Sequence, residues 1–300
     1  MILITGASGY LGGKLYGELK RQGLSVCSAG RGMADRHLDL ARNEDYSPLM
    51  AGVDTVVHCA GIAHSHARAE DYDTINRQGS SRLALAAKAM GVSRFLFFST
   101  LNVVPIDADD PNTCASQWAA PDNLYAASKH AAEIELVRIL TGSQCQLLIL
   151  RPALVYDTEL TGNLKTLRQV GRWFPFALPH SGSRSMVSRP DLVATVSRLL
   201  AGKGSGWGET QHIALTDGQR YVAQRIGEAL MGPRAWSLPN WLWRAVLLVC
   251  AGLPSSRTQG IARSLSEDLW TDMSGEPRGD DVRWDLQSLL ESPAAFGAGR

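Results

Sequence analysis

Short hydrophobic runs alternate with longer amphipathic stretches through the first half of the chain. Short apolar runs are typical of strands that are buried on both faces, and apolar residues at helical spacing are typical of helices packed against a sheet. The pattern predicts strands at Ile2–Thr5, Leu24–Ala29, Thr55–Cys59, Arg94–Ser99 and Gln146–Leu150, and helices at 10–22, 71–90 and 122–141. This alternation indicates an α/β fold with a doubly wound parallel sheet.

The pattern loosens after Arg151-Pro152, where proline, glycine and tryptophan become more frequent. Short helices are expected near 161–173, 189–202, 219–231 and 240–252. We therefore divide the chain into a first domain at 1–155 and a smaller, substrate-covering lobe at 156–300. A strand at Gln211–Leu215 is a candidate to return to the main sheet, in which case the two parts interleave.

The composition excludes several classes of protein. Thirty basic and twenty-nine acidic residues give a net charge of +1, which provides no long-range attraction for nucleic acid or an anionic membrane. The five cysteines lack C-x-x-C and other metal-ligand spacings, so we expect free thiols in the cytoplasm and no metal site. No signal peptide is expected, because the chain opens on a strand pattern. Segment 241–254 is shorter than the about 20 residues that span a bilayer and contains Arg244, which favours a buried or interfacial helix.

A glycine turn directly follows the first strand. Gly6, Gly9 and Gly12 stand three residues apart where the strand gives way to a helix. Glycines there allow a sharp turn, a close approach of backbone to ligand and tight packing of helix on strand. The amides at the helix start then face an anion, which the helix dipole favours. The turn predicts a site for a dinucleotide pyrophosphate, although the spacing differs from G-x-G-x-x-G and an ordinary glycine-rich turn is the alternative.

Tyr125 and Lys129 lie four residues apart on a predicted helix, so their side chains share one face. A phenol has an ordinary pKa near 10, and a neighbouring ammonium favours the phenolate, which would bring that pKa toward the range needed for general acid–base catalysis. The preceding buried strand ends in Ser99-Thr100, which puts a hydroxyl at the carboxyl edge of the sheet. These side chains predict a catalytic set, and a chance pair on a helix is the alternative.

These motifs resemble the extended short-chain dehydrogenase/reductases of the NAD-dependent epimerase/dehydratase family, from residue 3 to about 195. The resemblance implies an NAD(P)-binding, Rossmann-type domain with a C-terminal nucleotide-sugar lobe, and Thr100, Tyr125 and Lys129 as catalytic residues. It implies cofactor contacts at Gly6, Ser8, Gly9, Tyr10, Leu11, Gly12, Asp39, Leu40, Ala60, Gly61, Asn76, Tyr125, Lys129, Pro152 and Leu154. Asp39 would meet the adenine, and Asn76 would lie behind the active site.

The segments TGNLKTL and SRSMVSRPDLV resemble the nucleotide-sugar half of the same family. The resemblance puts Asn163 and Arg184 on a nucleoside diphosphate, where a guanidinium fork can pair with phosphate oxygens. His64 follows the cofactor wall and is a candidate for contact with the sugar. A surface ion pair is the alternative for Arg184, and a solvated loop is the alternative for His64. Departures from the family pattern around the sugar stand at Val104-Pro105, Leu124 and Asp157.

The end of the second strand indicates the preferred cofactor. An NAD site normally has a carboxylate there, about 20 residues after the glycines, which binds the ribose 2′-hydroxyl. This chain has Ser28-Ala29-Gly30-Arg31 instead, so a 2′-phosphate would meet Arg31, with Arg36 as a second partner. We expect NADP(H) to be preferred and NAD(H) to be the alternative. That Arg31 simply faces solvent is the alternative to this role.

The resemblance implies an NAD(P)-dependent nucleotide-sugar oxidoreductase, similar to bacterial enzymes of O-antigen sugar synthesis that reduce UDP-4-keto-6-deoxy-N-acetylhexosamines at C4. Tyr125 would exchange the proton at O4, Lys129 would tune Tyr125 and hold the nicotinamide ribose, and Thr100 would hydrogen-bond the same oxygen. A UDP-sugar 4-epimerase is the main alternative. A hydroxysteroid-type dehydrogenase and a non-catalytic dinucleotide-sensing module are further alternatives. Relatives suggest a homodimer through the helices at 71–90 and 122–141.

Overall fold

The computed structural model describes residues 1–63, 67–171, 173, 175–202, 207–234, 236–252, 265 and 283–292. The chain forms two compact units, and both are discontinuous in sequence. Unit 1 comprises Met1–Pro152 and Leu192–Leu215, and unit 2 comprises Ala153–Asp191 and Thr216–Arg300.

Unit 1 is built on a seven-stranded sheet in the order β10-β6-β5-β4-β1-β2-β3, and all of its neighbouring strands are parallel. The strands are β1 (Ile2–Thr5), β2 (Val26–Gly30), β3 (Arg36–His37), β4 (Thr55–His58), β5 (Arg94–Phe98), β6 (Gln146–Pro152) and β10 (Thr210–Leu215). The predicted doubly wound sheet is therefore confirmed. The strand from the second half of the chain does return, because β10 pairs with β6 from Thr210↔Leu147 to Leu215↔Pro152.

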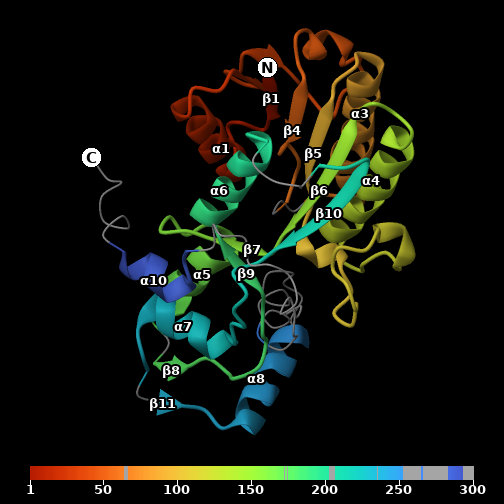
Figure 1. Cartoon of the computed structure of the whole chain (residues 1–300). Helices are drawn as coiled ribbons and strands as arrows, with labels where there is room; N and C mark the ends of the chain where they lie inside the picture. The colour runs from red at the N-terminus through yellow and green to blue at the C-terminus, as the bar shows by residue number, and fades with distance from the viewer. Residues whose placement is uncertain are drawn as a thin grey trace. The chain divides into compact units, whose positions relative to one another are not determined.

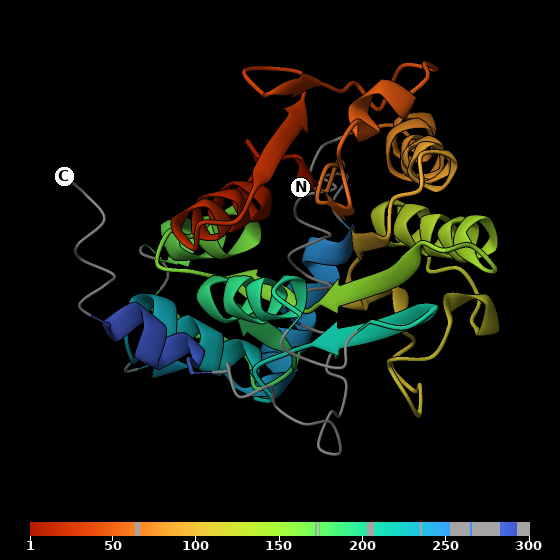
Figure 2. The same cartoon turned by 45° about the horizontal axis from the view of Figure 1, so that its top comes forward.

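Helices cover both faces of this sheet, with α3 and α4 on one face and α1 and α6 on the other (Figures 1 and 2). The helical segments are α1 (Tyr10–Arg21), α2 (Ala69–Tyr72), the π-helix η2 (Asp73–Gln78), α3 (Gly79–Ala89), α4 (Leu124–Leu140), α6 (Arg189–Leu200) and the 3₁₀ turns η1 (Ser47–Met50), η3 (Leu101–Val103) and η4 (Ala115–Gln117). The helix predicted at 71–90 as one element is instead interrupted by η2. Two-sided cover explains why every residue of β1 and β4 is buried.

Unit 2 contains two small parallel pairs, β7 (Leu154–Tyr156) with β9 (Met186–Ser188) and β8 (Phe176–Ala177) with β11 (Trp236–Ser237). Its helices are α5 (Gly162–Gly171), α7 (Ala223–Met231), α8 (Asn240–Gly252) and α10 (Leu286–Glu291). A buried carboxylate, Asp217, links two tyrosines in its core. It accepts hydrogen bonds from the hydroxyls of Tyr156 at 2.9 Å and Tyr221 at 2.6 Å.

Helix α8 occupies the apolar segment for which the sequence predicted a buried or interfacial helix. Trp243 and Leu247, one turn apart, are buried, while Trp241, Leu248 and Val249 are exposed. Among the described residues, no helix has both the length and the apolar character needed to cross a bilayer.

Candidate active site

The glycine turn connects β1 to α1 and has no room for side chains. Gly6 has a φ of +71°, and a Cβ there would lie 2.8 Å from the amide nitrogen of Ala60. A Cβ on Gly12 would collide with the carbonyl oxygen of Gly6. Gly9 is the N-cap of α1 and offers no side-chain cap, and the first turn of α1 carries no acid. The turn has no room for side chains, and no acidic residue lies in the first turn of the helix that follows. Such a turn fits the pyrophosphate of a dinucleotide. Ser8 is exposed at its tip, and Tyr10 and Leu11 begin the helix.

The turn after β2 contains Arg31, which is exposed, and also an acid that the sequence reading missed. The carboxylate of Asp35 accepts hydrogen bonds from the amide and the hydroxyl of Ser28, each at 2.8 Å, and these bonds lower the pKa of Asp35. Arg36, expected as a second partner for a 2′-phosphate, instead donates to the carbonyls of Leu49 and Ala51. Of the two arginines, Arg31 is therefore the one that remains directed to solvent at this edge.

The segment Asp39-Leu40 follows β3, and two side chains hold it by hydrogen bonds to its backbone carbonyls. Tyr46 donates to the carbonyl of Asp39 at 2.8 Å, and Arg82 donates to the carbonyl of Leu40 at 2.7 Å. Gly79 lies so close that a Cβ there would approach the Cβ of Leu40 to 2.8 Å. The position expected to meet the adenine is thus fixed from two sides.

Ala60 and Gly61 come after β4 and lie between the glycine turn and α4. The amide of Ala60 donates to the hydroxyl of Thr5 at 3.1 Å. A Cβ on Gly61 would lie 2.8 Å from Oδ1 of Asn76 and 3.5 Å from Nζ of Lys129. The predicted wall therefore lies against both Asn76 and Lys129. A side chain at position 61 would collide with the Asn76 amide, so only glycine fits there.

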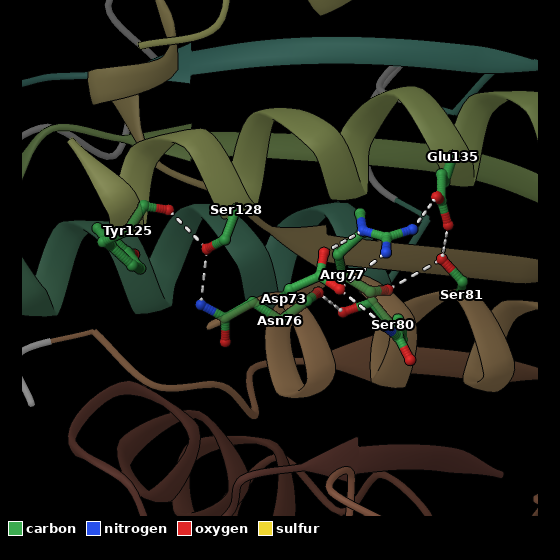
Figure 3. Close-up of polar contacts among 9 residues, drawn as sticks. Asp73, Asn76, Arg77, Ser80, Ser81, Tyr125, Ser128 and Glu135 are labelled. Atoms are coloured by element: carbon green, nitrogen blue, oxygen red, sulfur yellow. Dashed lines mark hydrogen bonds and ion pairs between the residues drawn. The ribbon is translucent and has the colours of Figure 1, made fainter. Parts of the chain in front are cut away.

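Asn76 is fully buried in the π-helical turn, and both polar atoms of its side chain form hydrogen bonds. Its Oδ1 accepts from the amide of Ile62 at 2.9 Å, and its Nδ2 donates to the carbonyl of Ile62 at 2.9 Å and to the hydroxyl of Ser128 at 3.0 Å. Ser128 in turn donates to the carbonyl of Tyr125 at 2.7 Å. Figure 3 shows this link from η2 to the first turn of α4. The π-turn inserts a residue at the point where the helix meets the site, as is common at functional positions.

A second polar link joins the same helices on the side away from Tyr125 (Figure 3). Arg77 forms ion pairs with Asp73 and with Glu135 of α4, and Ser81 donates to Glu135. The two links fix the rotation of α4 against η2 and α3. The face that carries Tyr125 and Lys129 is thereby set.

Lys129 is buried, and its ammonium donates to the carbonyl of Phe98 at 2.8 Å. It also lies 4.5 Å above the ring of Phe97, a cation–π contact. Burial lowers the pKa of Lys129 to about 8. Because Phe98 ends β5 two residues before Thr100, this bond joins α4 to the strand end that carries the predicted hydroxyl.

Tyr125 differs from expectation in its acidity. Burial around the hydroxyl raises its pKa to about 12, and the nearby Tyr72 ring, 6.5 Å away between centroids, adds to the rise. The predicted lowering by Lys129 is wrong for this arrangement, since the ammonium is directed at Phe98. Tyr125 therefore keeps its proton at neutral pH. Thr100 has an extended backbone, and its hydroxyl accepts from the amide of Asn102 at 3.3 Å.

A buried ion pair behind these residues was missed by the sequence reading. Arg151 and Glu133 are fully buried and joined at 2.6 Å. Ser99 also donates to Glu133, and Arg151 donates to the carbonyls of Pro111 and Thr113 at 2.7 and 2.8 Å. The pair holds the strand end at Ser99, α4 and the loop after η3 in one arrangement. The only signal in the sequence was a glutamate one turn beyond Lys129.

The remaining predicted contacts are distributed over both units. Pro152 ends β6 in unit 1, and Leu154 begins β7 in unit 2. Arg184 is half-buried, and its backbone pairs with Tyr221 through bonds of 2.9 and 3.0 Å. Asn163 lies in α5 without a described side chain, and His64 falls outside the described residues.

Unit 2 has two further features relevant to a ligand. Asp157, where the sequence departed from its family, forms a buried ion pair with Arg189. A cavity of about 400 Å³ is lined by residues that include Gln224, Asn240 and Trp243. Gln224 comes three residues after Tyr221, the backbone partner of Arg184.

Comparison with known proteins gives a consistent result. The model of the NAD dependent epimerase/dehydratase family matches residues 2–172. A UDP-glucose 4-epimerase of Vibrio cholerae is 28% identical over 270 residues, which cover 81% of this chain and 79% of that protein. The structure of MoeE5 in complex with UDP-glucose and NAD superposes with a TM-score of 0.70 at 20% identity, covering 96% of this chain and 95% of that one. WbmG of Bordetella bronchiseptica in complex with NAD also gives 0.70, at 19% identity, covering 98% and 93%.

Proposed function

The chain belongs to the NAD dependent epimerase/dehydratase family, and from this premise we propose that it reduces a UDP-4-keto-6-deoxy-N-acetylhexosamine at C4, in bacterial O-antigen sugar synthesis. The observation that carries the proposal is the arrangement of the site: Tyr125 and Lys129 share α4, and Lys129 donates to the carbonyl of Phe98, two residues before Thr100. The raised pKa of Tyr125, about 12, supports the direction of the reaction. Reduction of a ketone needs a proton donor beside the new hydroxyl. Oxidation of a hydroxyl, with which an epimerase begins, needs the phenolate. A tyrosine that keeps its proton favours reduction.

Each catalytic side chain has a role in this reaction. A reduced nicotinamide, when bound, supplies the hydride to C4. Tyr125 donates its proton to O4, so that the ketone becomes an alcohol and the phenol becomes a phenolate. The ammonium of Lys129, largely protonated below pH 8, would hold the ribose of the nicotinamide. Thr100 donates a hydrogen bond to the same oxygen.

The cofactor in this proposal is NADP(H). The glycine turn and the wall at Ala60 and Gly61 fit a dinucleotide, and exposed Arg31 would pair with a 2′-phosphate. Asp35 is the opposing feature, because its carboxylate lies beside the same strand but is held by Ser28. Titration of purified protein with NADPH and NADH tests the balance. Tighter binding of NADH would reject the preference and give Asp35 the role of the ribose-binding acid.

The substrate proposal rests on Arg184 as the group that binds the diphosphate. An apolar substrate such as a steroid needs no guanidinium, so Arg184 speaks against a hydroxysteroid-type dehydrogenase. The set of Thr100, Tyr125 and Lys129 likewise speaks against a non-catalytic dinucleotide-sensing module, which has no use for a proton donor.

The deciding assay supplies NADPH with a UDP-4-keto-6-deoxy-N-acetylhexosamine. A parallel reaction supplies UDP-glucose or UDP-N-acetylglucosamine without added cofactor. We expect one NADPH to be consumed for each keto sugar in the first reaction and no conversion in the second. Formation of the 4-epimer in the second, without consumption in the first, would establish the 4-epimerase, the function that the Vibrio cholerae relative bears and the second candidate here.

We also propose a homodimer and a cytoplasmic location. Leu85 of α3 is a large exposed apolar side chain on one of the helices expected at the interface, and its burial in a dimer would remove it from water. Sedimentation of Leu85→Glu against the natural chain tests this, and an unchanged mass would reject that interface. The five cysteines are free thiols, as is usual in a reducing compartment.

A further inference from the structure

His58, the last residue of β4, is fully buried between two hydroxyl groups. Its Nδ1 lies 2.7 Å from Oγ1 of Thr5, and its Nε2 lies 2.8 Å from Oγ of Ser80. Both ring nitrogens therefore have partners, one at the end of β1 and one at the start of α3. None of these three residues belongs to the predicted catalytic set.

The partners of the two hydroxyls fix the direction of the hydrogen bonds. Ser80 donates its proton to the carbonyl of Asn76, so it accepts from His58, and Nε2 must carry the ring proton. Nδ1 then accepts from the hydroxyl of Thr5, which itself accepts from the amide of Ala60 at 3.1 Å. The result is one directed chain from the amide of Ala60 through Thr5, His58 and Ser80 to the carbonyl of Asn76.

The surroundings keep His58 neutral. Its ring packs against Phe95 and Phe97, with centroids 6.1 and 5.7 Å away, and the ammonium of Lys129 lies 4.5 Å from the centroid of the Phe97 ring. Burial, with a contribution from the Lys129 charge, lowers the pKa of His58 to about 3. A neutral imidazole with one fixed tautomer serves as a rigid connector between a donor and an acceptor.

Both ends of the chain are backbone groups of the site itself. Ala60 is part of the wall expected along the cofactor, and Asn76 holds Ser128 and through it the carbonyl of Tyr125. Figure 3 shows Ser80 beside Asn76 and the link from Asn76 through Ser128 to Tyr125. A side chain that filled this space without polar atoms would leave the Thr5 hydroxyl proton without an acceptor in the core and would remove the donor to Ser80, at a cost in stability.

We propose that His58 is a positioning residue for the reaction: through Ser80 it sets the π-turn that orients Tyr125, and through Thr5 it sets the wall that receives the cofactor. The inference rests on the proposed function, because it assigns these positions to the reduction step. The two arms of the chain have separate readouts. The Ser80 arm governs kcat, and the Thr5 arm governs affinity for the cofactor.

Two substitutions at His58 separate the arms. An asparagine oxygen can replace Nδ1, so His58→Asn retains an acceptor for Thr5 and loses the bond to Ser80. A glutamine amide nitrogen can replace Nε2, so His58→Gln retains the donor for Ser80 and loses the acceptor for Thr5. We expect His58→Asn to lower kcat about tenfold or more with little change in cofactor Kd, since small misplacement of a reacting group is costly. We expect His58→Gln to do the opposite, weakening cofactor binding while largely keeping kcat.

Single substitutions at the partners and a control complete the test. Ser80→Ala should reproduce the kcat effect, and Thr5→Val should reproduce the effect on cofactor Kd. His212→Asn is the matched control, because His212 is a neutral histidine of β10 in the same sheet, with its pKa lowered to about 4. It should change neither quantity. Equal losses of kcat and affinity in His58→Asn and His58→Gln, in proportion to their losses in Tm, would reject positioning and leave a structural role.

A spectroscopic measurement keeps this inference separate from the proposed function. Long-range ¹⁵N–¹H spectra of the labelled natural chain should show His58 with the proton on Nε2 from pH 8 down to about 4. A proton on Nδ1, or titration near pH 6.5, would overturn the chain of hydrogen bonds. If the natural chain fails to reduce the keto sugar, the proposed function fails, while the tautomer and the cofactor affinities still decide the role of His58.

Discussion

Replacing Arg151 with methionine should strongly destabilise the fold. The substitution leaves the carboxylate of Glu133 buried without its partner, and loss of one member of a buried pair costs about 3–5 kcal/mol. It also removes the donors to the carbonyls of Pro111 and Thr113, each of which adds about 1–3 kcal/mol if it stays dry. We expect a loss of about 4 kcal/mol or more in the free energy of unfolding, a large part of the about 5–15 kcal/mol that a domain has.

Urea unfolding followed by tryptophan fluorescence and circular dichroism measures this loss. The double variant Arg151→Met/Glu133→Leu should recover about 2 kcal/mol or more of it, because no lone charge remains buried. Arg21→Met is the matched control, since the Arg21–Glu18 pair lies at the surface, where solvent screens it, and its loss should leave the free energy of unfolding essentially unchanged. A loss below about 1 kcal/mol for Arg151→Met, or no recovery in the double variant, would refute the reasoning.

Three further predictions concern the reaction. Tyr125→Phe should bind the cofactor normally and lose about a hundredfold or more in kcat, the usual contribution of a positioned acid; an unchanged kcat in a coupled NADPH assay would remove Tyr125 from the mechanism. Arg184→Ala should weaken UDP binding in calorimetry without affecting the dinucleotide, and equal UDP affinity would return Arg184 to the surface ion-pair interpretation. The rate of reduction should fall as pH rises through about 8, because Lys129 then loses the charge with which it would hold the nicotinamide ribose. Lys129→Met should abolish that limb of the pH profile, and a limb that persists belongs to another group.

The sheet could be predicted from the sequence because its strands are buried on both faces and read as continuous apolar runs, such as residues 147–150 of β6. Strand β3 could not, because Arg36 and His37 form a two-residue edge without apolar character. The π-turn at Asp73–Gln78 was equally hidden, since one inserted residue leaves the helical pattern of a short segment almost unchanged.

The candidate site shows the same division between local and long-range information. The spacing of Tyr125 and Lys129 is local, so their common helix face was predictable. The acidity of Tyr125 depends on burial by distant segments, and its predicted direction was wrong. Asp35 reaches Ser28 only because the chain turns back between β2 and β3, and Glu133 meets Arg151 only because α4 packs on β6. Contacts made by folding leave no mark in residue spacing.

The return of β10 to the sheet has a consequence for how the protein is made. Translation delivers β6 first, then all of Ala153–Asp191, and only afterwards the strand at Thr210–Leu215 that pairs with it. For roughly 3–12 seconds at ordinary rates of elongation, the N–H and C=O groups along one edge of β6 lack the strand that will pair with them, and its apolar side chains lie next to that open edge. A ribosome that stalls in that interval exposes an incomplete sheet that is prone to aggregation. Chaperone binding, and the translation rate set by synonymous codons, should therefore affect the yield most in this stretch of the message.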